Sequence, residues 1–306
     1  MKDAIQPLKA EKFFAQVLKH YEDMKDSYIY GVITRDCREK TEMIDAGYAR
    51  WLQQSLGFLC EKYRLPGKRI LDIGCGMGEL TVRMRTLGYE AYGLDLHKEH
   101  LRLATILAEE NGLPPTLFIL NSDNCEKKGR LPFEDRFFDI VTLFSSFEHI
   151  SDSGLNGLLP EVHRVSRGVV YVLVPNRLKP IDDHTGLKFV NWMPRWMARL
   201  YIRAHGRRRQ YRISRDGTWD VYNRTFGRVR TIVRNHGFDV DFIPDDFVFP
   251  LQSCSMISHI GKHLKFHGKT FLLGFPLPIK SMMKRGYPRQ GFYRYLNLLL
   301  LPKRGP

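Results

Sequence analysis

The sequence predicts a doubly wound α/β fold with a mostly parallel sheet. Short apolar runs alternate along the chain with longer segments of helical periodicity, which is the pattern of successive strand and helix units. The first apolar run, residues 69–73, leads directly into a glycine-rich turn. At 306 residues the chain is also long enough to bury the core of one such sheet with additions around it.

Two helices are expected before the sheet. Apolar residues recur at helical spacing over residues 8–30 and again over residues 43–64. Pro66 and Gly67 should end the second helix, because proline lacks the amide hydrogen that would continue it and glycine favours a turn. The chain should then enter the first strand.

Strands and helices are expected to alternate from residue 69 onward. Apolar runs bounded by glycine or proline predict buried parallel strands, and the periodic segments between them predict helices. The expected strands are 69–73, 90–94, 115–120, 139–144 and 169–174, and the expected helices are 79–87, 97–111 and 154–165. Such alternation places helices on both faces of a sheet.

The pattern is less regular beyond the fifth strand. Residues 177–219 mix aromatic residues with arginine, and no element is assigned there. A helix is expected over 226–236 and a strand over 239–243. Residues 251–291 are expected to form an insertion, and residues 295–301 a last strand of the sheet, with a membrane-seeking tail as the alternative for this last run.

The composition is that of an ordinary globular protein, with 43% apolar and 26% charged residues. The first residues lack the basic and apolar regions of a signal peptide, and no run reaches the roughly 18 apolar residues that span a bilayer. A cytoplasmic location is expected, with peripheral contact at the inner membrane face as an extension. The cysteines lack metal-site spacing and are expected to be free thiols: Cys37, Cys60, Cys75, Cys125 and Cys254.

The excess positive charge lies in the C-terminal part of the chain. Residues 1–176 contain 23 Lys and Arg against 25 Asp and Glu, whereas residues 177–306 contain 25 against 8. A one-sided field of this kind favours an anionic partner such as a nucleic acid, an acidic lipid or a phosphorylated substrate. A solvated basic surface is the alternative.

Gly74, Gly76 and Gly78 follow the first expected strand and precede a helix. Glycines at these positions let the backbone turn tightly and approach a ligand without side-chain interference. The spacing differs from the Gly-x-Gly-x-x-Gly of dinucleotide binders, and Glu79 at the helix start would repel a pyrophosphate. A nucleoside cofactor without phosphate therefore fits better.

Asp95 ends the second expected strand, 17 residues after Gly78. A carboxylate at this place can accept charge-assisted hydrogen bonds from the two hydroxyls of a ribose. The alternative role is that of an acid at the start of the following helix.

Residues 69–175 resemble the class I S-adenosylmethionine-dependent methyltransferases, a broad group that includes small-molecule and ubiquinone-pathway enzymes. The resemblance rests on the glycine loop, on Asp95, and on Leu131-Pro132-Phe133 followed by Phe138-Asp139. It implies a Rossmann-like methyltransferase fold with a seven-stranded sheet, and S-adenosylmethionine as the cofactor. The cofactor-binding residues that it implies are Asp72, Gly74, Cys75, Gly76, Gly78, Asp95, Leu96, Asp123, Asn124, Ser145 and Glu148.

The chain is expected to comprise three regions. Residues 1–66 are expected to form N-terminal helices, either as a lid over the acceptor or packed on the core, and residues 67–176 are expected to form the cofactor-binding core. Residues 177–306 form the rest of the catalytic domain, with basic insertions on the substrate side.

Two histidines are candidates for catalysis. His149 directly follows Glu148 after the fourth strand, where the family has a similar ending beside cofactor and substrate. There it either acts as a base or holds the loop in place. His184 lies in a loop similar to one in methyltransferases of polysaccharide and lipid-linked sugar pathways. Oriented by Asp182 or Asp183, it could remove a hydroxyl proton; a hydrogen-bonded surface histidine is the alternative.

Asn176, at the end of the fifth strand, and Asp183 are candidate substrate contacts. No metal is expected, since the sulfonium of the cofactor already activates the methyl group. The sequence does not determine the oligomeric state.

The expected acceptor is a small molecule or a glycan, on its own or linked to a lipid or phosphate carrier. The arginines expected to bind phosphate are Arg207, Arg208, Arg209 and Arg212. The basic aromatic segment expected to contact an acidic membrane surface contains Lys280, Lys284, Arg285, Tyr287, Phe292 and Tyr293. An RNA methyltransferase is the second interpretation, although no recognised RNA-binding module is present. A non-catalytic cofactor-binding partner subunit is the third.

Overall fold

The computed structural model describes residues 5–41, 48–120, 129–207, 221–248 and 288–303. The strands are β1 (Arg69–Ile73), β2 (Glu90–Asp95), β3 (Phe118–Leu120), β4 (Phe138–Phe144), β5 (Ser166–Pro175), β6 (Phe238–Phe242) and β7 (Tyr295–Pro302). The α-helices are α1 (Glu11–His20), α2 (Tyr28–Thr41), α3 (Tyr48–Lys62), α4 (Glu79–Thr86), α5 (Lys98–Glu110), α6 (Asp152–Val165), α7 (Arg195–Ala204) and α8 (Phe226–Asn235).

The strands form one seven-stranded sheet in the order β3-β2-β1-β4-β5-β7-β6. Strands β1 to β5 pair in parallel, and β7 is antiparallel to both β5 and β6. This confirms the predicted doubly wound, mostly parallel sheet. It also confirms residues 295–301 as a sheet strand.

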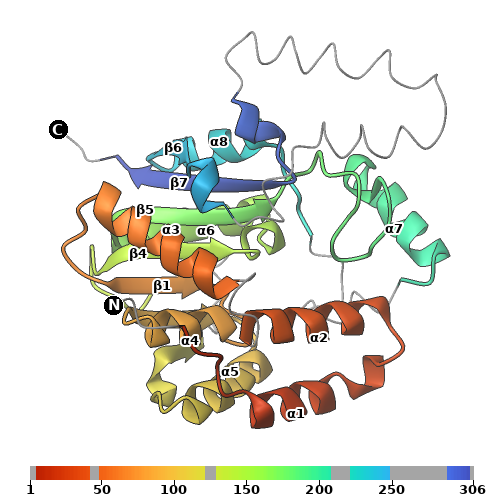
Figure 1. The fold of residues 1–306 in the computed structure, drawn as a ribbon. Coiled ribbons are helices and arrows are strands. Elements are labelled where there is room, and N and C mark those ends of the chain that lie inside the picture. The colour runs from red at the N-terminus through yellow and green to blue at the C-terminus, as the bar shows by residue number, and fades with distance from the viewer. Residues whose placement is uncertain (1–4, 42–47, 121–128, 208–220, 249–287, 304–306) are drawn as a thin grey trace.

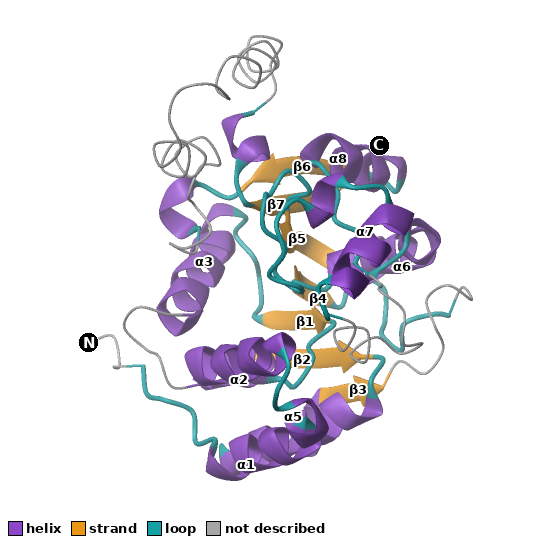
Figure 2. Cartoon of the chain, turned by 90° about the vertical axis from the view of Figure 1, so that its right-hand side faces the viewer, coloured by secondary structure: helices purple, strands orange, loops and turns teal. Residues whose placement is uncertain are grey.

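Helices cover both faces of the sheet (Figure 2). On one face, apolar residues of α6 and α8 such as Leu158 and Val229 pack against β4, β5 and β7. On the other face, Trp51 and Leu56 of α3 pack with Met84 of α4. Because β4 is buried along its whole length, its near-continuous apolar sequence reflects burial from both sides.

The N-terminal prediction of two helices is wrong in number, because three α-helices precede β1. Helix α1 ends near Tyr21, the short 3-10 turn Glu22–Met24 follows, and the Ser27 hydroxyl donates to the carbonyl of Met24. Helix α2 therefore begins in the interval that the periodicity had assigned to the end of the first helix. Its half-buried Ile33 packs in the same apolar cluster as Phe13 of α1.

The third strand is shorter than predicted. Residues Pro115–Leu117 form a 3-10 turn, and only Phe118–Leu120 pair with β2. Proline has no amide hydrogen to donate to the ladder, so the pairing begins beyond Pro115. The structure also contains a 3-10 turn, Val190–Trp192, and helix α7 in the stretch to which no element was assigned.

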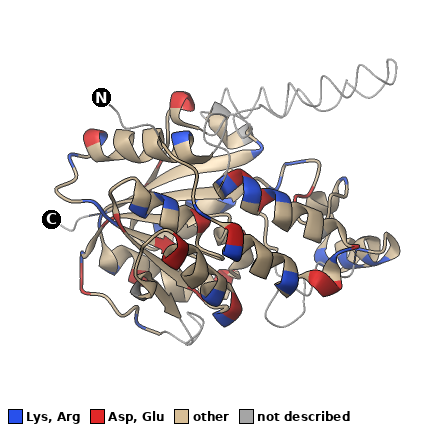
Figure 3. Ribbon diagram, turned by 60° about the horizontal axis from the view of Figure 1, so that its bottom comes forward, with Lys and Arg blue, Asp and Glu red and all other residues tan. Residues whose placement is uncertain are grey.

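Within the described ranges, no helix is both long and apolar enough to cross a membrane. Basic and acidic residues are interspersed along the helices in Figure 3. Cys37, Cys60 and Cys75 are free thiols, whereas Cys125 and Cys254 lie outside the described residues. So does nearly all of the expected insertion 251–291.

Candidate functional site

The glycine loop joins β1 to α4 at the carboxyl edge of the sheet. Gly74, Gly76 and Gly78 have φ values of +73°, +56° and +84°, a region that side chains disfavour. A Cβ added at Gly74 would overlap the side chain of Ser146, whereas one at Gly76 would meet no atom within 4 Å. The loop is thus packed against the fold at Gly74 and open at Gly76, which leaves room for a ligand beside its middle residue.

Asp72 stabilises the start of this loop through side-chain hydrogen bonds. Its carboxylate is buried and accepts hydrogen bonds from the hydroxyls of Thr81 (2.7 Å) and Thr142 (2.8 Å). Burial raises its pKa to about 6, although the two hydroxyl donors act in the opposite direction. Asp72 thus ties β1 to α4 and β4, and its contact with the methionine part of a cofactor stays a prediction.

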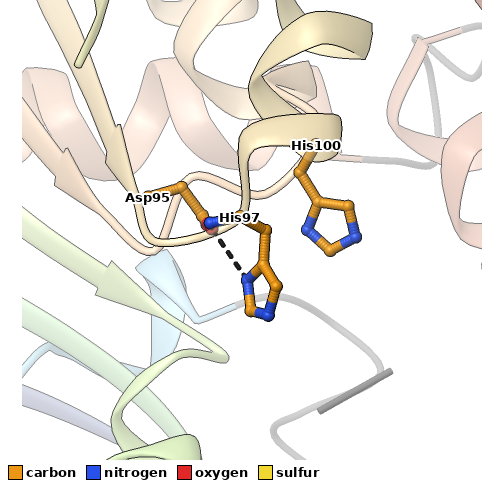
Figure 4. A group of neighbouring side chains, drawn as sticks. All are labelled: Asp95, His97 and His100. Atoms are coloured by element: carbon orange, nitrogen blue, oxygen red, sulfur yellow. Dashed lines mark hydrogen bonds and ion pairs between the residues drawn. The ribbon is translucent and has the colours of Figure 1, made fainter. Parts of the chain in front are cut away.

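Asp95 lies at the end of β2, and Figure 4 shows its carboxylate beside His97. It accepts hydrogen bonds from the backbone amide of Gly76 (2.9 Å), and from the amide (2.8 Å) and ring Nδ1 (3.1 Å) of His97. Burial alone would raise the pKa of Asp95, but these donors and His100 hold it below its ordinary value. The group is therefore an anion at neutral pH.

These residues fit the ribose and base of a nucleoside. A carboxylate offers about four acceptor positions, and Asp95 already uses three, so a ribose would share it with or displace the ring of His97. Leu96, the next residue, is 37% exposed and could provide an apolar surface for the base. Cys75 is buried. Burial raises the pKa of the Cys75 thiol well above its ordinary value, which argues against a nucleophilic role.

A second edge of the site is the turn after β4. Ser145 is exposed with φ +51°, and Ser146 donates from its hydroxyl to the carbonyl of Ile73 at 2.8 Å. The 3-10 turn Phe147–His149 then presents Glu148 and His149. The turn is therefore bonded to the end of β1.

Arg224 holds this turn from the C-terminal half of the chain. Its guanidinium is 6% exposed and donates to the carbonyls of Phe147 (3.3 Å) and Ile150 (2.7 Å). The neighbouring amide of Tyr222 donates to the carbonyl of Glu148 at 2.6 Å. Residues far apart in the sequence thus fix the position of Glu148 and His149.

His149 and His184 face one another at the site. Their Nε2 atoms are 3.2 Å apart, within hydrogen-bond distance, and the rings meet edge to face. The Nδ1 atom of His184 lies 3.8 Å from a carboxylate oxygen of the fully buried Asp182. Of the two predicted orienting acids, the structure therefore places Asp182 behind the ring.

The carboxylates around His184 govern its charge. Burial would lower the pKa of His184, but Asp182, Glu148 and Asp183 raise it by more, to about 9. Glu148 is 1% exposed, and burial raises its pKa, while one of its oxygens has no hydrogen-bond partner among the described residues. This oxygen is available to a donor on a ligand.

Asp183 belongs to a neighbouring cluster. The ammonium of Lys179, which is 1% exposed, donates to Asp183 and to the hydroxyl of Tyr295 (2.9 Å), and Tyr295 donates to Asp183 at 2.7 Å. This cluster ties the loop that carries His184 to β7. The Asp183 side chain is 36% exposed and therefore accessible to a ligand, and its contact with substrate stays a prediction.

Asn176 is used inside the fold. Its side chain is fully buried, its amide donates to the carbonyls of Gly291 and Tyr293 (both 2.9 Å), and its oxygen accepts from the amide of Leu178 (3.1 Å). These bonds count against the predicted substrate contact, which stays untested. Asp123 and Asn124 lie outside the described residues.

Two groups in the described part of the chain bring three ligand atoms within 4.8 Å of one another. They are Asp95, His97 and His100, and Glu148, His149 and His184. Two histidines and a carboxylate can bind a divalent ion, so the expectation of a metal-free site needs a direct test.

Sequence reasoning missed Arg224, Lys179 and Tyr295. Each has at least one partner more than 70 residues away in the sequence, and such contacts leave no local motif. Their burial could not be anticipated from residue type, because Arg and Lys are mostly exposed.

The fold and the site define an α/β protein in which a glycine loop and a buried carboxylate meet at the carboxyl ends of parallel strands. Residues 70–168 match the family model described as a methyltransferase domain. A ubiquinone biosynthesis O-methyltransferase of Paraburkholderia phymatum is 36% identical over 88 residues, which are 29% of this chain and 36% of that protein. The protein of the same description from Proteus mirabilis is 37% identical over 86 residues, 28% of this chain and 33% of that protein.

The matched segment thus spans about a third of these curated relatives. Among solved structures, YcgJ from Bacillus subtilis is similar, with 18% identity and a TM-score of 0.43 over 82% of this chain and 99% of that one. Residues 70–168 therefore form a methyltransferase domain of the S-adenosylmethionine-dependent class, whose cofactor is S-adenosylmethionine.

Proposed function

We propose that the chain transfers a methyl group from S-adenosylmethionine to a hydroxyl of a small molecule or glycan, on its own or linked to a lipid or phosphate carrier. The observation that carries this proposal is the pair of facing imidazoles, His149 and His184, with Asp182 behind the second ring. A carboxylate-backed imidazole is the arrangement expected for a base that acts on a hydroxyl.

The cofactor supplies a methyl group that is already electrophilic. The residues of the chain then hold the acceptor oxygen in line and receive its proton. We assign proton acceptance to Nε2 of His184, with its Nδ1 proton directed at Asp182. With the cofactor bound, the methyl group would pass to the acceptor oxygen with S-adenosylhomocysteine as the leaving group, and the imidazole of His184 would keep the hydroxyl proton.

Cofactor binding is assigned to Asp95 for the ribose and to the loop around Gly76 for close backbone approach. Asp95 is anionic, and Gly76 leaves open space where a side chain would stand. Ser145, Glu148, Asp123 and Asn124 complete the proposed set. The two curated relatives are both named O-methyltransferases, which supports transfer to oxygen.

A phosphate-bearing or acidic acceptor suits the charge of the chain. Residues 177–306 carry 25 Lys and Arg against 8 Asp and Glu. The guanidinium of Arg207 lies 4.8 Å from the ring centre of Tyr28, at the start of α2 and close to the loop of His184. Arg208, Arg209 and Arg212 follow in the chain, outside the described residues.

The test is methyl transfer from isotopically labelled S-adenosylmethionine to fractionated extracts. Label is expected in a lipid, glycan or small-molecule pool, and it should be lost with the Asp95→Ala variant. Label in the RNA pool would favour the RNA methyltransferase, which the basic C-terminal part also suits. Cofactor binding by calorimetry with no labelled product in any pool would favour the partner subunit without catalysis.

A further inference from the structure

Large exposed apolar side chains gather in one short stretch of the chain. Of those in the described residues, all but Leu96 and Leu120 lie between residues 189 and 200. They are Phe189 (46% exposed), Trp192 (36%), Trp196 (66%), Met197 (38%) and Leu200 (58%). We call these five side chains the patch, and their concentration within twelve residues marks an interaction surface rather than ordinary scatter.

Helix α7 has two apolar sides. Ala198 and Ile202 are fully buried and attach the helix to the protein. Trp196 and Leu200, four residues apart, lie one turn from each other on the exposed side. The solvent-facing side of an ordinary surface helix is polar, so we expect the exposed apolar side of α7 to bind a partner.

Cations flank the exposed apolar residues. Lys188, Arg199 and Arg203 are exposed. The sequence contains no Asp or Glu from residue 184 to residue 215, and nine Lys and Arg. Tryptophan with arginine and no acid is the composition that favours the headgroup region of an acidic bilayer.

The patch is fixed to the loop that carries His184. The amide of Phe189 donates to the carbonyl of Pro180 (2.6 Å), and the indole nitrogen of Trp192 donates to the carbonyl of Leu178 (3.1 Å). Figure 1 shows α7 beyond the carboxyl ends of the parallel strands, and Figure 2 views the molecule from that side. A surface that touches α7 therefore also lies on the side of the proposed site.

We propose that α7 and the turn Val190–Trp192 dock on a bilayer that contains acidic phospholipids, and that the acceptor is an amphiphile held in that bilayer. Trp196 and Leu200 enter the boundary between headgroups and acyl chains, while Arg199 and Arg203 bind lipid phosphates. The second half of this inference rests on the proposed function. The docking itself does not require turnover.

The charge pattern favours a bilayer over other partners. A second copy of the chain would present the same cations to this face, and like charges brought together repel. RNA would use the cations but would leave Trp196, Met197 and Leu200 without a matching apolar surface over most of the patch. An acidic bilayer satisfies both components at once.

The test is flotation of the full chain with vesicles of phosphatidylcholine alone and with about 30% phosphatidylglycerol. Binding is expected only to the acidic vesicles, and it should weaken at about 0.5 M salt because screening removes the ionic part. The variant Trp196→Ala/Leu200→Ala should bind at least about tenfold more weakly. Arg199→Glu/Arg203→Glu should weaken binding similarly.

Matched controls come from other exposed sites. Leu120→Ala removes an exposed apolar side chain at the far edge of the sheet, and Arg230→Glu reverses an exposed charge on α8. Both should bind vesicles as the unaltered chain does. Calorimetry with S-adenosylmethionine should give the same affinity in all these variants, which separates docking from cofactor binding.

Several results would overturn the docking proposal. They are no flotation of the unaltered chain, equal binding to neutral vesicles, unchanged binding by both patch variants, or self-association in light scattering that Trp196→Ala/Leu200→Ala abolishes. Tighter binding to single-stranded RNA, lost in the same variants, would assign the face to nucleic acid instead. Vesicle binding without any cofactor binding would leave docking intact and remove the proposed function.

Discussion

His184 is the residue whose proton decides whether the site can act on a hydroxyl. An unperturbed histidine has a pKa near 6.5, and here it is raised to about 9, chiefly by Asp182 against the effect of burial. The folded state therefore favours the imidazolium. Its contribution to stability is fully present below about pH 6.5 and is lost as the pH rises through about 9.

Catalysis has the opposite dependence on pH, because a base must be neutral. We expect kcat/KM to rise about tenfold per pH unit and to level off near pH 9 in the free enzyme. A rate profile measured with labelled S-adenosylmethionine checks this. A flat profile from pH 6 to pH 9 would exclude His184 as the base.

Replacement of the acid behind the ring gives a sharper result. Asp182→Asn removes the largest influence that raises the pKa of His184, so the rising limb should move to lower pH by at least about one unit. Asp183→Asn is the matched comparison in the same loop, and its smaller influence predicts a smaller shift. Equal shifts would contradict the placement of Asp182 as the positioning residue.

Asp95 is the residue on which cofactor affinity should depend most. Asp95→Ala is expected to weaken S-adenosylmethionine binding by about 1.5–3 kcal/mol, the loss of a hydrogen bond to a charged group. Titration calorimetry measures it. Glu90→Ala, an acid at the opposite end of the same strand, should leave the affinity unchanged; equal losses in both variants would point to a general defect.

A chelator separates base catalysis from metal catalysis at the same residues. With His184 as base, activity should be the same before and after EDTA treatment, because neither the methyl donor nor the base needs an ion. Loss of activity that zinc or magnesium restores would reassign Glu148, His149 and His184 as ligands. Elemental analysis of the purified protein provides an independent readout.

Single residues were predictable where an acid or histidine follows a strand. Asp95 ends one strand and His149 lies in the turn after another, and parallel strands bring such ends to one edge. Arg224 was not predictable, since it donates to carbonyls 74 and 77 residues away. The orienting role of Asp182 rather than Asp183 also depended on the fold, because Lys179 and Tyr295 engage the other acid.

Among the elements, the glycine loop makes the most specific demand on sequence. Gly74→Ala forces a side chain into a left-handed conformation and against Ser146, so we expect a loss of about 2–4 kcal/mol in the free energy of unfolding. Gly76→Ala meets only the conformational cost, about 1–2 kcal/mol, but should weaken cofactor binding. Urea denaturation and calorimetry measure the two effects, and the reverse order of stabilities would contradict the described packing.

The elements of the core were predicted closely because burial on both faces produces uniform apolar strands. The bounds of β1 agree in full, and those of β2, β4 and β6 agree within one residue. The third strand and the N-terminal helices were less predictable, since Pro115 shortened one and a short polar turn divided the other. Helix α7 escaped prediction because its exposed face is also apolar, which erases the usual polar side.

At the scale of the whole molecule, Arg83 connects the N-terminal helices to the core. Arg83 is 2% exposed, and its guanidinium donates to the carbonyls of Gln6 (2.6 Å) and Thr41 (3.1 Å). Arg83→Ala removes both of these hydrogen bonds and the buried side chain, and should lower the free energy of unfolding by about 2–4 kcal/mol, measured in urea. The control Arg102→Ala removes only an exposed pair with Glu99 and should change it by under about 0.5 kcal/mol.

The lid role of the N-terminal helices stays a prediction at this scale. Trp51 is buried against the sheet, whereas Tyr28 contacts the loop of His184 near Gly186. The first three helices thus combine a packing surface with one edge of the site. The strand order itself could come only from the family resemblance, because nothing in the sequence of β7 shows that it enters between β5 and β6.

The position of β7 between β5 and β6 has a consequence for how the chain folds during synthesis. Among the described strands, β6 pairs only with β7, so it cannot join the sheet until residues 295–302 have left the ribosome. Until then the apolar edge of β5, completed some 120 residues earlier, is unpaired and can template wrong pairing. Yield during synthesis should therefore depend on chaperone supply more than the stability of the finished sheet suggests.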